Sequence, residues 1–135
     1  MNNPETVTEA FIQWLEQEGI GAFGTDIYSP QIPEDAPDAA YWLQTAGGGV
    51  VLTLATGEKV KQYFVTINYR SRKGKEVERK LFDLENLINK PQCLKLTGFE
   101  VYEVSATQFP VDNDLDDEDR RIGFVQANIQ IYKKD

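Results

Sequence analysis

The side chains that usually carry catalysis are scarce in this sequence. It contains no histidine and a single cysteine, Cys93. Histidine-dependent triads, Cys–His pairs and histidine-ligated metal sites are therefore excluded, and one thiol can form neither a metal cluster nor an internal disulfide. We expect Cys93 to be a small packing or surface residue rather than a nucleophile. Carboxylates remain as catalytic candidates, because paired acids can hydrolyse glycosides.

The acidic side chains gather in one polar segment of the chain. Six of them fall within eight residues: Asp112, Asp114, Asp116, Asp117, Glu118 and Asp119. A glycosidase pair needs a walled cleft, so we expect no catalytic role here. The segment begins like a calcium loop, but an EF-hand needs glycine at its sixth position and glutamate at its twelfth. Those positions hold Asp117 and Gly123. We therefore expect a solvated, self-repelling loop and no cofactor, with weak calcium binding as the alternative.

A basic segment opposes this acidic segment. Residues 70–80 contain six basic side chains against two glutamates, a local balance of +4. The whole chain carries a net charge of -8, and removing the six clustered acids leaves -2. Such a charge argues against binding nucleic acid by neutralising its phosphates. The two segments are instead candidates for a subunit interface or a channel lining: Arg70, Arg72, Lys73 and Lys75, with the six acids named above.

Three consecutive glycines, Gly47, Gly48 and Gly49, are the other motif that could bind a ligand. Glycine-rich loops can cradle phosphates, but no lysine follows in Walker spacing and no G-x-G-x-x-G pattern is present. We interpret the glycines as a flexible hairpin loop.

The N-terminal half predicts one helix followed by short extended segments. Asn3 suits an N-cap, Pro4 suits the first helical position, and Gly19 suits the helix end. Between them an apolar stripe recurs at helical spacing and is most simply core, with a partner-binding face as the alternative: Val7, Ala10, Phe11, Trp14 and Leu15. Extended segments are predicted at residues 26–28, 40–45 and 50–54, with a turn at Thr56 and Gly57.

The C-terminal half predicts strands at residues 63–71, 99–109 and 121–132, with a helix at 75–89 between the first two. The resulting fold class is α+β, with a mixed, mostly antiparallel sheet of four to five strands and two helices on one face. The other face carries Gln126, Asn128 and Gln130 and would meet solvent or a partner. The 135 residues suit a single domain spanning 1–135. No run is apolar enough to span a bilayer, and no secretory signal precedes the first helix.

Six stretches resemble the small tail terminator and minor capsid (neck) proteins of tailed bacteriophages. They are residues 5–15 (ETVTEAFIQWL), 26–28 (DIY), 32–37 (IPEDAP), 61–65 (KQYFV), 96–101 (LTGFEV) and 116–132 (DDEDRRIGFVQANIQIY). The likeness extends over nearly the whole chain, and the order of elements agrees with the α+β fold of that family.

The resemblance implies a structural virion protein of the phage neck or tail, assembled in the host cytoplasm, and no enzyme. Such a protein forms a hexameric ring at the head-proximal end of the tail tube, stops tube polymerisation and joins the tail to the head. Its implied partners are copies of itself, the tail tube protein and a head-connector or head-completion protein. DNA passes through the channel without specific binding, and no membrane is involved. The alternatives are another head–tail joining or minor capsid subunit, or a small non-viral binding module.

Overall fold

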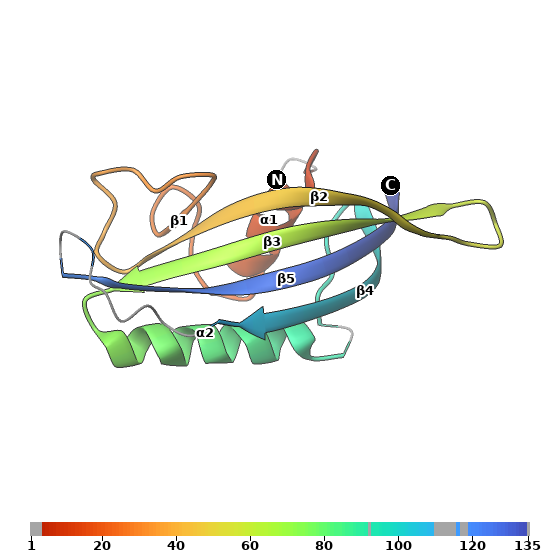
Figure 1. Cartoon of the computed structure of the whole chain (residues 1–135). Helices are drawn as coiled ribbons and strands as arrows, with labels where there is room; N and C mark the ends of the chain where they lie inside the picture. The colour runs from red at the N-terminus through yellow and green to blue at the C-terminus, as the bar shows by residue number, and fades with distance from the viewer. Residues whose placement is uncertain (1–3, 92, 110–115, 117–118, 135) are drawn as a thin grey trace.

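The structure is a computed structural model that describes residues 4–134, except 92, 110–115, 117 and 118. Its elements are α1 (Val7–Gln17), β1 (Ile27–Tyr28), β2 (Ala40–Thr53), β3 (Lys59–Ser71), α2 (Gly74–Asn89), β4 (Phe99–Gln108) and β5 (Arg121–Lys134). The five strands form one sheet in the order β1-β2-β3-β5-β4, in which only the β1–β2 pairing is parallel. Both helices contribute to a core on one face of the sheet (Figure 1). The predicted α+β fold class is confirmed.

Helix α1 begins later than the sequence pattern predicts. Thr6, not Asn3, is the N-cap: its backbone is extended and its hydroxyl accepts a hydrogen bond from the Glu9 N–H at 3.1 Å. Pro4 and Glu5 precede the helix, and Asn3 lies outside the described residues. The hydroxyl satisfies a backbone donor that the first helical turn leaves unpaired, and this sets the start. The predicted end is confirmed, because Gly19 follows the helix with a φ of 75°.

The stripe of α1 forms core, as predicted. Trp14 is 2% exposed, packs against Phe11 with ring centroids 5.5 Å apart, and donates its indole N–H to the Cys93 carbonyl at 3.2 Å. The core cluster joins residues of both helices to residues of β5: Phe11, Trp14, Leu15, Leu81, Leu84, Ile88, Ile129 and Ile131. The helical period of 3.6 and the strand period of 2 therefore bring the same side chains together.

Helix α2 is tied to the sheet at both ends. Near its start, Glu76 accepts hydrogen bonds from the Tyr69 hydroxyl at 2.8 Å and the Ser71 hydroxyl at 3.3 Å. The Tyr69 bond is the main reason that the pKa of Glu76 lies below its usual value. At its end, the Asn89 amide exchanges two hydrogen bonds with the Ala106 backbone, at 2.8 and 2.9 Å. These bonds fix the position of the helix along β3 and β4.

The three glycines lie inside strand β2 and not in a hairpin loop, so that prediction is wrong. Gly47 pairs with Tyr63 and Gly49 with Gln62, which leaves Gly48 as the extra residue of a β-bulge. A Cβ on Gly48 would stand 3.1 Å from the ring of Phe64, and Gly49 has a φ of 89°. Side chains here would be crowded or strained, which explains the glycines without a ligand.

The β2–β3 hairpin continues past this bulge as an arm, residues 47–62, that projects beyond the rest of the sheet (Figure 1). Its turn lies where predicted, with the Leu54 N–H donating to the Glu58 carbonyl at 2.8 Å and Gly57 at a φ of 91°. At Lys59 and Val60, on the turn side of Lys61, β3 has β2 as its only described strand partner. The hairpin arm is therefore a two-stranded ribbon in its outer part, where Leu52 and Thr53 pair with Val60 and Lys59, whereas Lys61 and Gln62 also pair with β5.

None of the helices in the described part of the chain has the length and apolarity needed to cross a membrane.

Trp14→Ala should lower the free energy of unfolding by about 3–5 kcal/mol, because it removes a buried aromatic side chain and leaves a cavity. Chemical denaturation measures this value. Phe82→Ala is the control, since Phe82 is 55% exposed on α2 and its loss should change stability by less than about 0.5 kcal/mol. Equal effects of the two substitutions would contradict the burial of Trp14.

Candidate assembly surfaces

The start of the predicted basic segment and Asp116 of the predicted acidic segment lie at the same end of the sheet within a single chain. Ser71 at the end of β3 pairs with Arg121 at the start of β5. Beside this pair, the Arg72 guanidinium lies 2.7 Å from the Asp38 carboxylate, and Arg120 lies 3.6 Å from the other Asp38 oxygen. Part of the basic charge is thus neutralised by Asp38, which comes from the loop before β2.

Arg120 also joins this charged end to the acidic segment. Its guanidinium lies 2.9 Å from the Asp116 carboxylate, and Asp116 accepts a further hydrogen bond from the Arg120 N–H at 2.8 Å. Asp119 has a φ of 60° in the turn between them. The other four predicted acids, Asp112, Asp114, Asp117 and Glu118, lie outside the described residues.

Arg70 is buried, which sequence reasoning did not anticipate for a candidate interface residue. It is 6% exposed and donates to the Pro37 carbonyl at 3.1 Å. Burial is the main cause that lowers its pKa, and the neighbouring Arg120 adds to this effect. Lys73 and Lys75, at the start of α2, are exposed. The single chain therefore offers these two lysines to a partner and uses Arg70 internally. Whether the two segments face each other between subunits stays a prediction.

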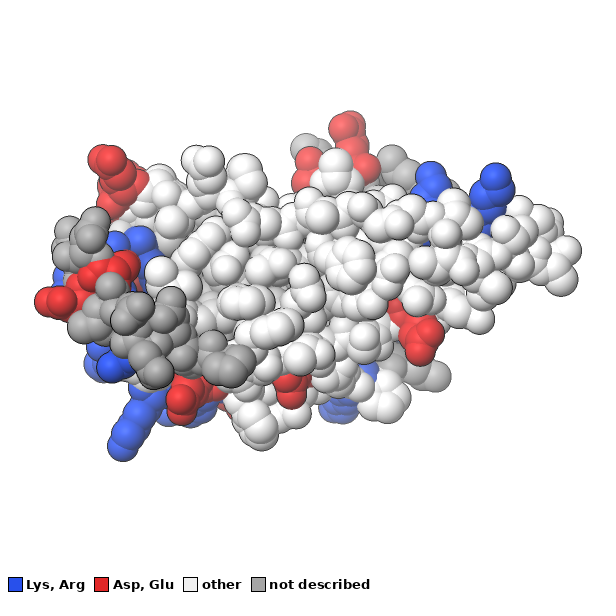
Figure 2. All heavy atoms as spheres, viewed as in Figure 1, with Lys and Arg blue, Asp and Glu red and all other residues white. Residues whose placement is uncertain are grey.

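The second surface is the helix-free face of the sheet, which is broad and nearly uncharged. Pairing between strands places Trp42 beside Asn68, Phe64 beside Asn128, and Thr66 beside Gln126 on this face. In Figure 2 charged side chains lie towards the margins of the view and the middle is free of them. A protein of net charge -8 that keeps one face neutral has a surface suited to contact with another protein.

The tip of the hairpin arm is the third surface. Val50, Val51 and Leu52 are consecutive and exposed there. Lys59 and Lys61 are exposed on the opposing strand. Exposed aliphatic residues at the end of a projecting ribbon are typical of a segment that binds another protein.

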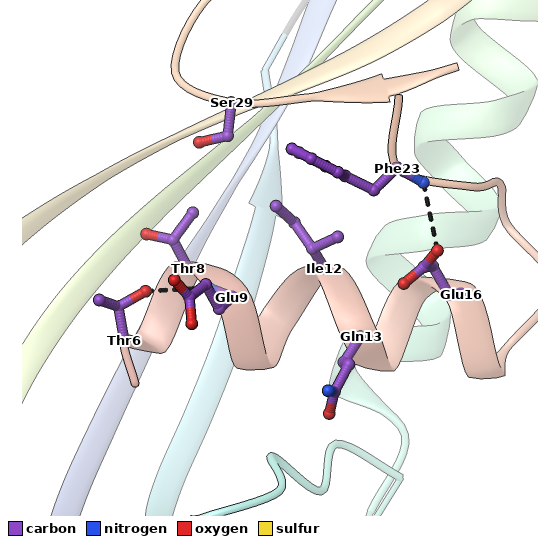
Figure 3. A pocket seen from close by; sticks show the side chains of 8 residues that line it. All are labelled: Thr6, Thr8, Glu9, Ile12, Gln13, Glu16, Phe23 and Ser29. Carbon is purple, nitrogen blue, oxygen red and sulfur yellow. Dashed lines mark hydrogen bonds between the residues drawn. The ribbon is translucent and has the colours of Figure 1, made fainter. Parts of the chain in front are cut away.

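The fourth surface is a groove of about 430 Å³ beside α1, here called the α1 groove (Figure 3). Ile12 and Phe23 form its apolar part, and Phe23 is 57% exposed. Glu9 and Glu16 form its acidic part, and Glu16 accepts a hydrogen bond from the Phe23 N–H at 3.2 Å. In the sequence, Phe23 stands between Gly21 and Gly24, and no local pattern places it beside the helix.

The α1 groove lies near an open edge of the sheet. Strand β1 pairs with β2 only at Tyr41 and Trp42, so in the described chain the rest of that β2 edge has no strand partner. The Thr8 hydroxyl, which lines the groove, lies 2.6 Å from the Thr45 hydroxyl of β2. Side chains from outside can therefore reach both the helix and the strand edge.

Within the described part of the chain, no three histidine, cysteine, aspartate or glutamate side chains gather closely enough to hold a metal ion. Most of the run considered for calcium is outside that part. Cys93 is partly exposed and packs against the core.

No protein-family model matches this sequence, and no curated protein matches it significantly.

Arg72→Gln should raise the pKa of Asp38, which the wild-type protein holds below its usual value chiefly through the hydrogen bond from Arg72. A carboxyl group with a lowered pKa stabilises the fold above its unfolded pKa, about 3.9, and loses this contribution as the pH falls through the folded value. The variant should thus lose less stability on acidification. Carboxyl-carbon NMR during a pH titration gives the pKa directly.

Lys75→Gln removes one exposed positive charge from the same region and should leave the Asp38 titration close to wild type. An unchanged Asp38 pKa in Arg72→Gln would contradict the assigned cause.

Proposed function

We propose that this chain is a structural subunit that assembles with copies of itself into a closed ring. The proposal rests mainly on the hairpin arm, which carries exposed Val50, Val51 and Leu52 away from the body of the protein. A ring built head to tail needs two different surfaces on each subunit. An arm at one end and a separate groove and neutral sheet face on the body meet this requirement.

The stability of the arm supports the same proposal. An isolated two-stranded ribbon is marginally stable in water, and apolar side chains at its tip add no stability while they face solvent. Packing the tip against another subunit would bury these side chains and stabilise the ribbon.

The place of the ring in a phage particle is proposed from the sequence resemblance. The ring would end the tail tube at its head-proximal side, stop the addition of tube subunits and present a surface to the head connector or head-completion protein. Its work is steric and interfacial and involves no covalent step. The net charge of -8 supports the passage of DNA, because an acidic lining repels phosphates instead of binding them.

In solution the wild-type protein should form a closed species with six times the chain mass of 15.3 kDa as its concentration rises. Sedimentation equilibrium and native mass spectrometry measure the mass, and negative-stain electron microscopy should show annular particles. A protein that remains monomeric at every concentration, or forms open fibres, would contradict the closed ring.

The phage role has its own test. Particles made without this protein by the phage that encodes it should show tails of uncontrolled length that are not joined to heads. Tails of normal length that are joined to heads would contradict the terminator role. They would not contradict the closed ring.

A further inference from the structure

We propose that the tip of the hairpin arm of one copy docks in the α1 groove of the next copy. This inference rests on the proposed self-assembly and names the two surfaces that meet. The apolar donor is Val50, Val51 and Leu52, and the apolar acceptor is Ile12 with Phe23.

The apolar parts of the two surfaces are complementary. Val51 is 46% exposed on the arm, and Phe23 is 57% exposed over the groove. In Figure 3 the Ile12 side chain rises from α1 on the side where the Phe23 ring lies, and both residues line the groove. Ile12 is 7% exposed, so Phe23 presents most of the apolar surface. The groove volume of about 430 Å³ falls within the range of pockets that hold ligands. Short aliphatic side chains can enter such a groove and cover the exposed Phe23 ring.

Charge is distributed unevenly along the chain. No lysine or arginine occurs before Lys59. Residues 1–57 contain eight acidic side chains and no basic one. The remaining residues contain 14 of each sign and are neutral in sum. The acidic part includes α1 and the whole α1 groove, whereas the first two basic residues, Lys59 and Lys61, lie on the arm.

The charged groups beside these surfaces are available for an intermolecular contact. Within the described chain, Glu9 and Glu16 each accept a hydrogen bond from a backbone N–H and form no ion pair. Lys59 and Lys61 are exposed and form no ion pair with a described residue. An arm entering the groove would place two cations near two carboxylates, which favours this orientation over its reverse.

The placement of the two surfaces favours contact between copies over contact within one copy. The arm projects from one end of the sheet, whereas α1 packs against the middle of the sheet on its helix-covered face (Figure 1). The ribbon runs away from its own helix, so the tip meets the groove of another copy. Because donor and acceptor are different surfaces, each copy can give one arm and receive one, as a head-to-tail ring requires.

Site-specific cross-linking tests the docking in the full-length protein. In a Cys93→Ser background, Val51→Cys combined with Phe23→Cys should yield a ladder of covalent oligomers with a short bis-maleimide under native conditions. Val51→Cys combined with Phe82→Cys is the matched control, since Phe82 is a similarly exposed phenylalanine outside the groove. The control pair should give no ladder.

A substitution at the tip supplies a second measurement. Val51→Asp should weaken association at least tenfold in sedimentation equilibrium and leave the melting temperature of the monomer unchanged, because the side chain is exposed. Phe23→Asp should have the same effect on association, and Phe82→Asp should have none. Circular dichroism confirms that each variant is folded.

The charged residues have a separate effect on rate. Lys59→Glu with Lys61→Glu should slow association at low salt, and the difference from wild type should shrink as salt increases. Stopped-flow light scattering follows the rate. If the variant and the wild type associate at equal rates at every salt concentration, the proposed electrostatic contribution of Lys59 and Lys61 is wrong.

The outcomes separate this inference from the proposed function. If the wild type forms rings while Val51→Asp or Phe23→Asp also assembles normally, the docking is wrong and the ring stands. Equal ladders from the test and control cysteine pairs would also overturn the docking. If the wild type stays monomeric at all concentrations, both proposals fall together.

Discussion

The alternation of side chains along β3 is the constraint on which the rest of the structure depends. β3 is paired along both edges, with β2 on one side and β5 on the other. Its residues Val65, Ile67 and Tyr69 face the helices and are buried, while Phe64 and Thr66 face the other way. A shift of one residue in the pairing would exchange the two faces and expose the core. The burial of one face by α1 and α2 therefore fixes the register of the three central strands.

The helices cover only one face of the sheet, and this determines which surfaces remain open to other molecules. Two helices are enough to close the core, and they leave the opposite face of the sheet and one edge of β2 open. The open face is stabilised by bonds between uncharged side chains, such as the 2.7 Å bond from the Gln62 amide to Asn128. Hydrogen bonds of this kind satisfy polar groups without charge repulsion, so such a face can approach another protein at little electrostatic cost. Charged side chains lie elsewhere, and one group of them is at the end of the sheet where Asp38 meets two arginines.

The sequence predicted the fold better than it predicted the surfaces. Periodic patterns identified both helices, the core and the strands, because burial imposes the periods of 3.6 and 2 on a sequence. The start of α1 was misplaced because Asn3 and Thr6 are both good caps, and the sequence does not show which of the two side chains accepts a hydrogen bond from the first turn. The glycines were misread because a bulge inside a long strand and a loop between two strands use the same residue. Arg70 was placed among the candidate interface residues. It is buried instead because it contacts Pro37, and a contact between segments far apart in the chain leaves no local pattern in the sequence. The α1 groove has no local pattern for the same reason.

A division of roles follows from the sizes of the forces at the proposed contact. Exposed ion pairs contribute about 0–1 kcal/mol each, whereas full burial of an aliphatic side chain contributes about 1.5–3 kcal/mol. The apolar tip would thus supply most of the affinity, and Lys59 with Lys61 would mainly guide approach and orientation. A single arm buries few side chains, so one such contact alone would be weak. A closed ring removes this weakness, because a subunit within it is held by the arm that it gives and the arm that it receives. Release then requires both contacts to break, so a set of individually weak contacts can hold a ring that forms reversibly and persists once it is closed.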